Sequence, residues 1–106
     1  MKSYLTYGLS TQSREDLIQQ LNSAFGIEFT AHESAYRGVY HRSGPTGQEH
    51  FLLQPNYLTH EDEWIEEKHQ EFPLLLYVNE TTRPDEIDRL LQRAIPFATK
   101  LKREDL

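Results

Sequence analysis

Two segments with helical periodicity, separated by a series of short strand-like segments, restrict what this chain can fold into. In residues 14–25 the apolar side chains fall at helical spacing, namely Leu17, Ile18, Leu21 and Phe25. In residues 84–95 they form a single stripe, namely Ile87, Leu90, Leu91, Ala94 and Ile95. An amphipathic helix packs its stripe against another element, so the segments between the helices are expected to supply an apolar surface.

Local signals mark the ends of both predicted helices. Ser13, followed three residues later by Asp16, resembles a capping box at the start of the first helix, and Gly26 is a typical C-terminal cap. In the second segment Thr82 is suited to the capping position and Pro84 to the first turn. These residues predict where both helices begin and where the first one ends.

The strand-like segments alternate in polarity or are short and apolar. They are residues 3–9, 27–34, 35–42, 49–54 and 72–78. The sequence between the third and fourth, SGPTG, has the composition of a hairpin turn. The resulting order, β-α-β-β-β-β-α, predicts an α+β fold. We expect an antiparallel sheet of four to five strands with two helices packed on one face.

The chain of 106 residues has the size of one domain, so we expect a single domain over residues 1–106. Pro96 should end or kink the second helix, which predicts a frayed or lightly docked tail over residues 97–106. Cysteine is absent, and the N-terminus has no apolar run long enough for a signal peptide. No stretch approaches the length of about 18 apolar residues that spans a bilayer, so we expect a cytoplasmic protein.

The net charge of −6 is concentrated in one segment of the chain. Residues 61–71 contain six of the 17 acidic residues and one of the 11 basic residues, which leaves 11 acidic against 10 basic residues elsewhere. A negative focus of this kind repels phosphate groups and attracts basic proteins. We therefore expect a basic protein partner, and neither nucleic acid nor a membrane.

This acidic segment lies in the longest predicted connection, residues 56–71, and surrounds the only tryptophan, Trp64. Loops longer than about 12 residues in small domains are usually functional or disordered. Tryptophan with a charged rim is typical of an interface hot spot, whereas a solvated loop would use Trp64 as an anchor in the core. Both interpretations remain open, and the interface hypothesis assigns partner binding to Glu61, Asp62, Glu63, Trp64, Glu66 and Glu67.

Two tyrosines in the third strand-like segment extend this hypothesis. Tyr36 and Tyr40 are evenly spaced about Gly38, so on one strand they share a face. They are either core residues or, with Arg37, further anchors of a protein interface. We include both tyrosines in the predicted partner-binding set.

The histidines allow a catalytic alternative. They are His32, His41, His50, His60 and His69. The sequence after His32 lacks the second histidine of a zincin motif, and no metal or cofactor site is predicted. His41 and His50 flank a predicted hairpin with Arg42 nearby, which is the minimal set for RNA cleavage by general acid–base catalysis. That activity requires both imidazoles to reach one cleft.

Four motifs in order resemble small bacterial immunity proteins of polymorphic toxin systems, including those of contact-dependent growth inhibition. They are FGIEF, ESAYRGVYHR, EHFLLQPN and FPLLLYV, with the acidic segment before the last, and the resemblance covers roughly residues 25–95. It implies a cytosolic protein without catalysis that binds a cognate toxin domain, often a nuclease with a basic cleft, and blocks it. A small interaction or adaptor domain and, third, the histidine-dependent enzyme are the alternatives.

Overall fold

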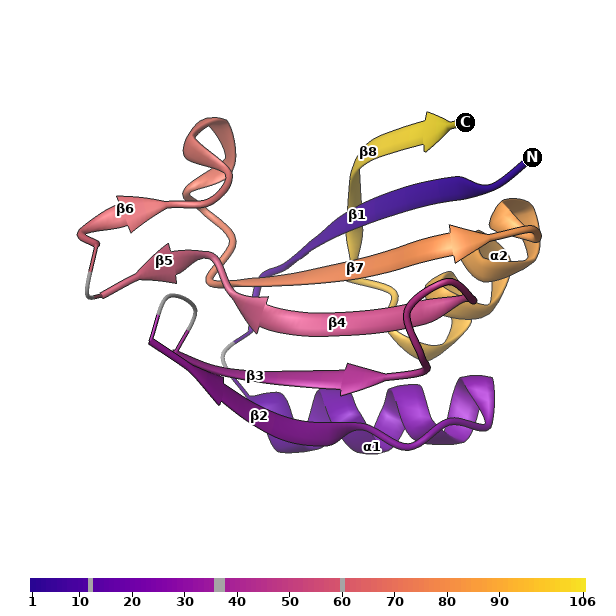
Figure 1. Cartoon of the computed structure of the whole chain (residues 1–106), viewed down its shortest axis with the longest axis horizontal. Coiled ribbons are helices and arrows are strands. Elements are labelled where there is room, and N and C mark those ends of the chain that lie inside the picture. Colours follow the sequence, from indigo (N-terminus) through magenta and orange to yellow (C-terminus); the bar gives the residue numbers. More distant parts are fainter. Residues whose placement is uncertain (12, 36–37, 60) are drawn as a thin grey trace.

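The computed structural model describes residues 1–11, 13–35, 38–59 and 61–106. In chain order the elements are β1 (Ser3–Leu9), α1 (Arg14–Phe25), β2 (Thr30–Ser34), β3 (Gly38–Ser43), β4 (His50–Pro55), β5 (Tyr57–Leu58), β6 (Glu63–Trp64), the short 3₁₀ helix η1 (Glu67–His69), β7 (Leu74–Thr81), α2 (Pro84–Ala94) and β8 (Thr99–Asp105) (Figure 1).

The main sheet is antiparallel and has the strand order β2-β3-β4-β7-β1-β8 in the part of the chain described. The α+β class and the antiparallel sheet are confirmed, but the prediction of four to five strands is one strand short. A separate two-stranded hairpin, β5–β6, lies at one end of the sheet (Figure 1). The predicted order therefore lacks this hairpin and the last strand.

The additional strand comes from the predicted frayed or lightly docked tail at residues 97–106, and that prediction is wrong. β8 pairs with β1, and the backbones of Lys2 and Leu106 exchange two hydrogen bonds of 3.0 and 2.8 Å, so the two termini lie side by side (Figure 1). Ser3 also donates a hydrogen bond of 2.5 Å to the carboxylate of Asp105. An exposed, charged edge strand needs no apolar alternation, which is why the pattern did not reveal it.

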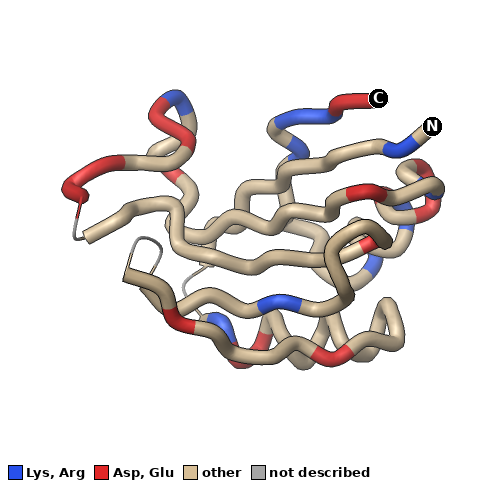
Figure 2. The backbone as a smooth tube through the Cα atoms, viewed as in Figure 1, with Lys and Arg blue, Asp and Glu red and all other residues tan. Residues whose placement is uncertain are grey.

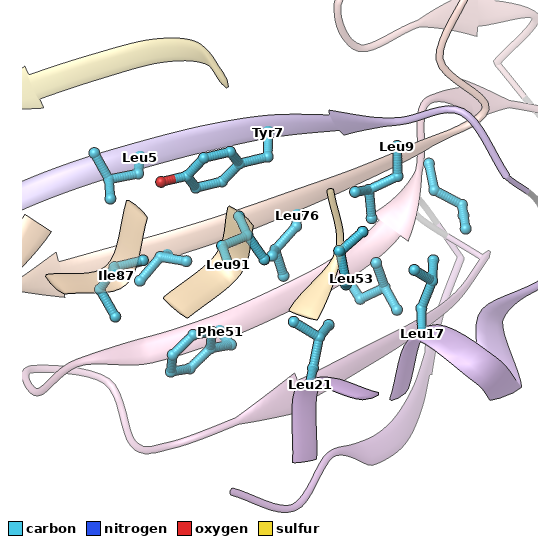
Figure 3. Packing of buried hydrophobic residues seen from close by; sticks show 13 residues of the cluster. Leu5, Tyr7, Leu9, Leu17, Leu21, Phe51, Leu53, Leu76, Ile87 and Leu91 are labelled. Carbon is cyan, nitrogen blue, oxygen red and sulfur yellow. The ribbon is translucent and has the colours of Figure 1, made fainter. Parts of the chain in front are cut away.

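Both helices cover the same face of the sheet. Leu5 pairs with Val78 and Tyr7 with Leu76, and residues paired across antiparallel strands point to the same face. The core on this face contains Leu5, Tyr7, Leu9, Leu17, Leu21, Phe51, Leu53, Leu74, Leu76, Val78, Ile87, Leu91 and Ile95 (Figure 3). The two predicted apolar stripes thus supply Leu17 and Leu21 from α1 and three residues from the chain around α2.

The predicted helix ends are confirmed in part. Gly26 ends α1 in the left-handed conformation, with φ of 64°, and its N–H donates to the carbonyl of Asn22. Pro84 begins α2, but the capping position belongs to Arg83 instead of Thr82. The hydroxyl of Ser13 donates to the carboxylate of Asp16 at 2.9 Å, and the backbone N–H of Ser13 donates to the hydroxyl of Thr11, so neither side chain to backbone bond of a capping box is formed.

The opposite face of the sheet is covered in part by the connection between β4 and β7. Leu52, Leu58 and Leu75 are buried there, with exposed fractions of 8%, 3% and 0%, although they lie outside the helix-side core. A Cβ atom on Gly8 would lie 2.5 Å from the ring of Phe72, so glycine is the residue that lets this connection approach β1. The long connection is therefore packed on the sheet.

Candidate partner-binding site

The acidic segment is held by a buried asparagine. Asn56 has an exposed fraction of 0%, and its side-chain amide donates hydrogen bonds to the carbonyls of His69 (3.0 Å) and Phe72 (2.9 Å). Its Oδ1 accepts the backbone N–H of Glu66 at 2.8 Å, and its backbone carbonyl accepts the N–H of Ile65 at 2.7 Å. Asn56, at the start of the connection between β4 and β7, is thus hydrogen-bonded to the middle of that connection and to its end.

Sequence reasoning missed Asn56. It lies within the predicted connection, and its role depends on contacts with residues 10 to 16 positions away, which no periodic pattern reports. The proline before it and its own turn propensity are the signals present in the sequence. They indicate a turn and give no indication of an anchor.

We call residues 57–69 the acidic hairpin. Five acidic residues of the predicted site lie on it, and the acidic positions of this segment are red on the backbone trace (Figure 2). Glu61, Asp62, Glu63 and Glu67 are exposed, and Glu66 is half-buried. Within the described residues none of these five carboxylates forms an ion pair.

Trp64 lies on this hairpin and outside the helix-side core. Its backbone pairs with that of Tyr57, and the two rings have centroids 5.0 Å apart at 57°. The Tyr57 hydroxyl donates to the carboxylate of Asp62, a hydrogen bond that raises the pKa of Tyr57 above its ordinary value. Trp64 is half-buried, so it presents part of its surface beside the carboxylates.

Two cavities adjoin Trp64. One, of about 450 Å³, lies between the hairpin and the sheet face that the helices leave uncovered. The other, of about 400 Å³, is lined by Arg14, Pro55, Tyr57, Trp64, Pro73 and Leu74. Burial lowers the pKa of Arg14, whose guanidinium donates to the carbonyl of Val39 at 2.8 Å.

The two predicted tyrosines have different outcomes. Tyr36, like Arg37, lies outside the described residues. Tyr40 is half-buried on β3, where its ring stacks on that of His32 with centroids 5.4 Å apart. Because the next residue but one, Arg42, pairs with Leu52, Tyr40 points to the same sheet face as the acidic hairpin.

The histidine pair required for catalysis is not formed. His41 pairs with Leu53 and therefore points to the helix-covered face, whereas His50 pairs with Asn79 and points to the opposite face. Burial, with the charges of Arg14 and His32, lowers the pKa of His41. The hypothesis of a shared cleft is therefore wrong, since the two imidazoles lie on opposite faces of the sheet.

Arg42, the third member of that set, supports a turn. Its guanidinium donates to the carbonyl of Gly44 at 3.0 Å and to the hydroxyl of Thr46 at 2.8 Å. These contacts fix the loop between β3 and β4.

Further comparisons add no family assignment. Among the described residues no group of three histidine or acidic side chains is placed to hold a metal ion, and no helix has the length and apolarity needed to cross a bilayer. The sequence matches no protein-family model and no curated protein. The acidic hairpin is therefore the structural feature that bears on function.

Proposed function

We propose that the protein is a non-catalytic immunity protein that binds a cognate toxin domain with a basic surface and neutralises it. The observation that carries this proposal is the acidic hairpin: five clustered carboxylates without an ion-pair partner among the described residues, on a segment that Asn56 fixes to the sheet. The resemblance of the sequence motifs to immunity proteins agrees with it.

Clustered like charges repel one another, so their concentration on one hairpin has an electrostatic cost for the isolated chain. A basic partner removes that cost when it binds. The field of the cluster also attracts such a partner over a distance of about one Debye length, roughly 8 Å at physiological salt, and raises the rate of encounter. Fast encounter suits an inhibitor that must act before its toxin does.

The hairpin also provides an anchor for such an interface. Trp64 and Tyr57 form an aromatic pair that is surrounded by exposed carboxylates. Large aromatic residues within a polar rim are typical of the residues that dominate binding energy. Phosphate-rich partners are disfavoured by the same negative field, which supports a protein partner over nucleic acid or an anionic membrane.

One observation favours the interaction-domain alternative. β2 forms one edge of the main sheet, and its residues Thr30–Glu33 are exposed. An exposed edge strand can add a strand from a second chain. In that case binding depends on the backbone of β2 and is insensitive to the charge of the acidic hairpin.

The test uses the protein encoded beside this gene as the candidate toxin. Its expression should stop growth of a host strain, and co-expression of this chain should restore growth. Reversing two hairpin charges, Glu61→Lys with Glu67→Lys, should slow association of the purified proteins about tenfold at low salt, because rim charges act mainly on the encounter rate.

The matched control reverses two exposed acids elsewhere, Glu28→Lys with Glu33→Lys, and so changes the net charge equally. It should bind at nearly the parental rate and still restore growth. Absence of any binding to the neighbouring protein, or equal slowing by the two pairs of reversals, refutes the proposal.

A further inference from the structure

The cavity of about 450 Å³ has one wall on the sheet and one on the acidic hairpin. The sheet wall consists of alternate residues of two adjacent strands, Leu52 and Gln54 of β4 and Tyr77 and Asn79 of β7. Its volume lies within the range of about 300–1,000 Å³ that is usual for ligand sites.

Gln54 gives this wall a buried hydrogen-bond acceptor. Its exposed fraction is 4%, and among the described residues its Oε1 has no hydrogen-bond partner. Buried polar atoms are almost always satisfied, because an unmade hydrogen bond in a place without water is costly. The side chain is therefore suited to a donor that the described residues do not supply.

The hairpin wall places a negative charge opposite this acceptor. Glu63 pairs with Leu58 across β5 and β6, so the two side chains point to the same side of the hairpin, and both line the cavity. Glu63 forms no ion pair with the described residues. The apolar side chains of Leu52, Leu58 and Ile65 also line the cavity.

We propose that this cavity receives an arginine side chain of the protein partner. A guanidinium has five N–H donors in a planar fork, so it can donate to the Glu63 carboxylate on one wall and to Gln54 Oε1 on the other. The three methylene groups of arginine match the apolar lining. A lysine has a compact charge without this fork, and fits the two opposed acceptors less well.

That the arginine comes from a protein partner rests on the proposed function, whereas the affinity of the cavity for a guanidinium does not. The first experiment therefore uses a small probe, N-acetyl-arginine N-methylamide, with the intact protein. Trp64 is the only tryptophan and lines the cavity, so its fluorescence reports on binding. A saturable change is expected, and the citrulline analogue, which has nearly the same shape without the charge, should bind at least about tenfold more weakly.

Two variants of the cavity lining and one control variant locate the probe. Glu63→Gln should weaken binding about tenfold, because it removes a charge-assisted hydrogen bond. Glu61→Gln removes the same charge two residues away, outside the cavity lining, and should leave binding nearly unchanged. Gln54→Leu has a similar volume and removes the acceptor; it should weaken binding while the melting curve shows that the protein is folded.

Three results with the probe overturn the proposal: no saturable response, equal binding of the citrulline analogue, or parental affinity of both Gln54→Leu and Glu63→Gln. The last result would mean that an ordered water satisfies Gln54. If the toxin partner binds both variants as tightly as the parental protein, the arginine site is refuted and the proposed function stands. If no toxin partner is found but the probe binds as expected, the cavity is supported and the proposed function fails.

Discussion

Replacing Asn56 by alanine should destabilise the protein by about 3 kcal/mol. The side chain forms three hydrogen bonds in a fully buried site, to the carbonyls of His69 and Phe72 and from the N–H of Glu66. Each contributes about 1 kcal/mol net, and the partners left buried without a hydrogen bond add to the loss. Against a total stability of about 5–15 kcal/mol for a domain, this is a large effect from a residue outside the main core.

Urea unfolding followed by two signals measures the effect. Far-UV circular dichroism reports on the whole fold, and the fluorescence of Trp64 reports on the acidic hairpin. With a slope of about 1–2 kcal/mol/M, a loss of 3 kcal/mol lowers the midpoint by roughly 2 M. Because the lost contacts hold the hairpin, the fluorescence transition of Asn56→Ala should precede the circular dichroism transition, whereas the two coincide in the parental protein.

The control is Gln70→Ala, which removes an exposed amide from the same connection and should leave the midpoint unchanged. If Asn56→Ala shifts the midpoint by less than about 0.5 M and the two transitions coincide, the hairpin is not held by this residue. The description of the acidic segment as an anchored surface would then be refuted.

Three further predictions test other parts of the structure. Trp64→Ala should cost only about 1–2 kcal/mol of stability, against about 3–5 kcal/mol for Phe51→Ala in the core. It should nevertheless weaken partner binding by about 2 kcal/mol or more. Thermal melts measure the first effect and calorimetric titration the second, and a stability loss as large as that of Phe51→Ala refutes the interface role. Deleting residues 99–106 should lower the melting temperature by more than about 5 °C, because β1 loses one of its two pairing partners and becomes the edge of the sheet, whereas an unchanged melt would mean that β8 contributes nothing to stability. The Arg83 guanidinium, through its hydrogen bonds, lowers the pKa of Glu49. This pair therefore stabilises the fold above the unfolded pKa of about 4.3, and the stabilisation is lost as the pH falls through the folded pKa. Glu49→Gln should remove about 1 kcal/mol of stability at pH 7 and flatten the acid limb of a stability–pH curve, and an unchanged acid limb contradicts this prediction.

The elements that the sequence predicts well are those whose burial leaves a periodic pattern. Leu17 and Leu21 of α1 and Ile87 and Leu91 of α2 are buried, as their helical spacing predicts. The chain at residue 26 adopts the left-handed conformation, which glycine adopts more readily than other residues, so Gly26 predicts the end of α1. Periodicity and backbone chemistry act locally, so one sequence is enough to detect them.

The elements that escaped prediction depend on contacts distant in sequence. β8 is charged and mostly exposed, so its pairing with β1, about 100 residues earlier, has no apolar signal. The strands of the acidic hairpin have two residues each, too few for a period. The sequence does not distinguish the two roles of Trp64, because a tryptophan suits both a core and an interface, and its place outside the helix-side core follows from the fold.

The two sides of the acidic hairpin have separate physical roles. Leu58 faces the sheet and, with residues of β4 and β7, covers part of the face opposite the helices, whereas Glu61 and Glu67 are exposed to solvent. Inward residues therefore contribute to stability, and outward carboxylates contribute to the field that a partner meets. Because these contributions come from different side chains, outward charges can change with the partner while the fold is maintained. Glu63 lies between the two roles, since it is exposed and also lines the cavity. Substitution at Glu63 should therefore change the affinity for a basic ligand with little change in the melting temperature.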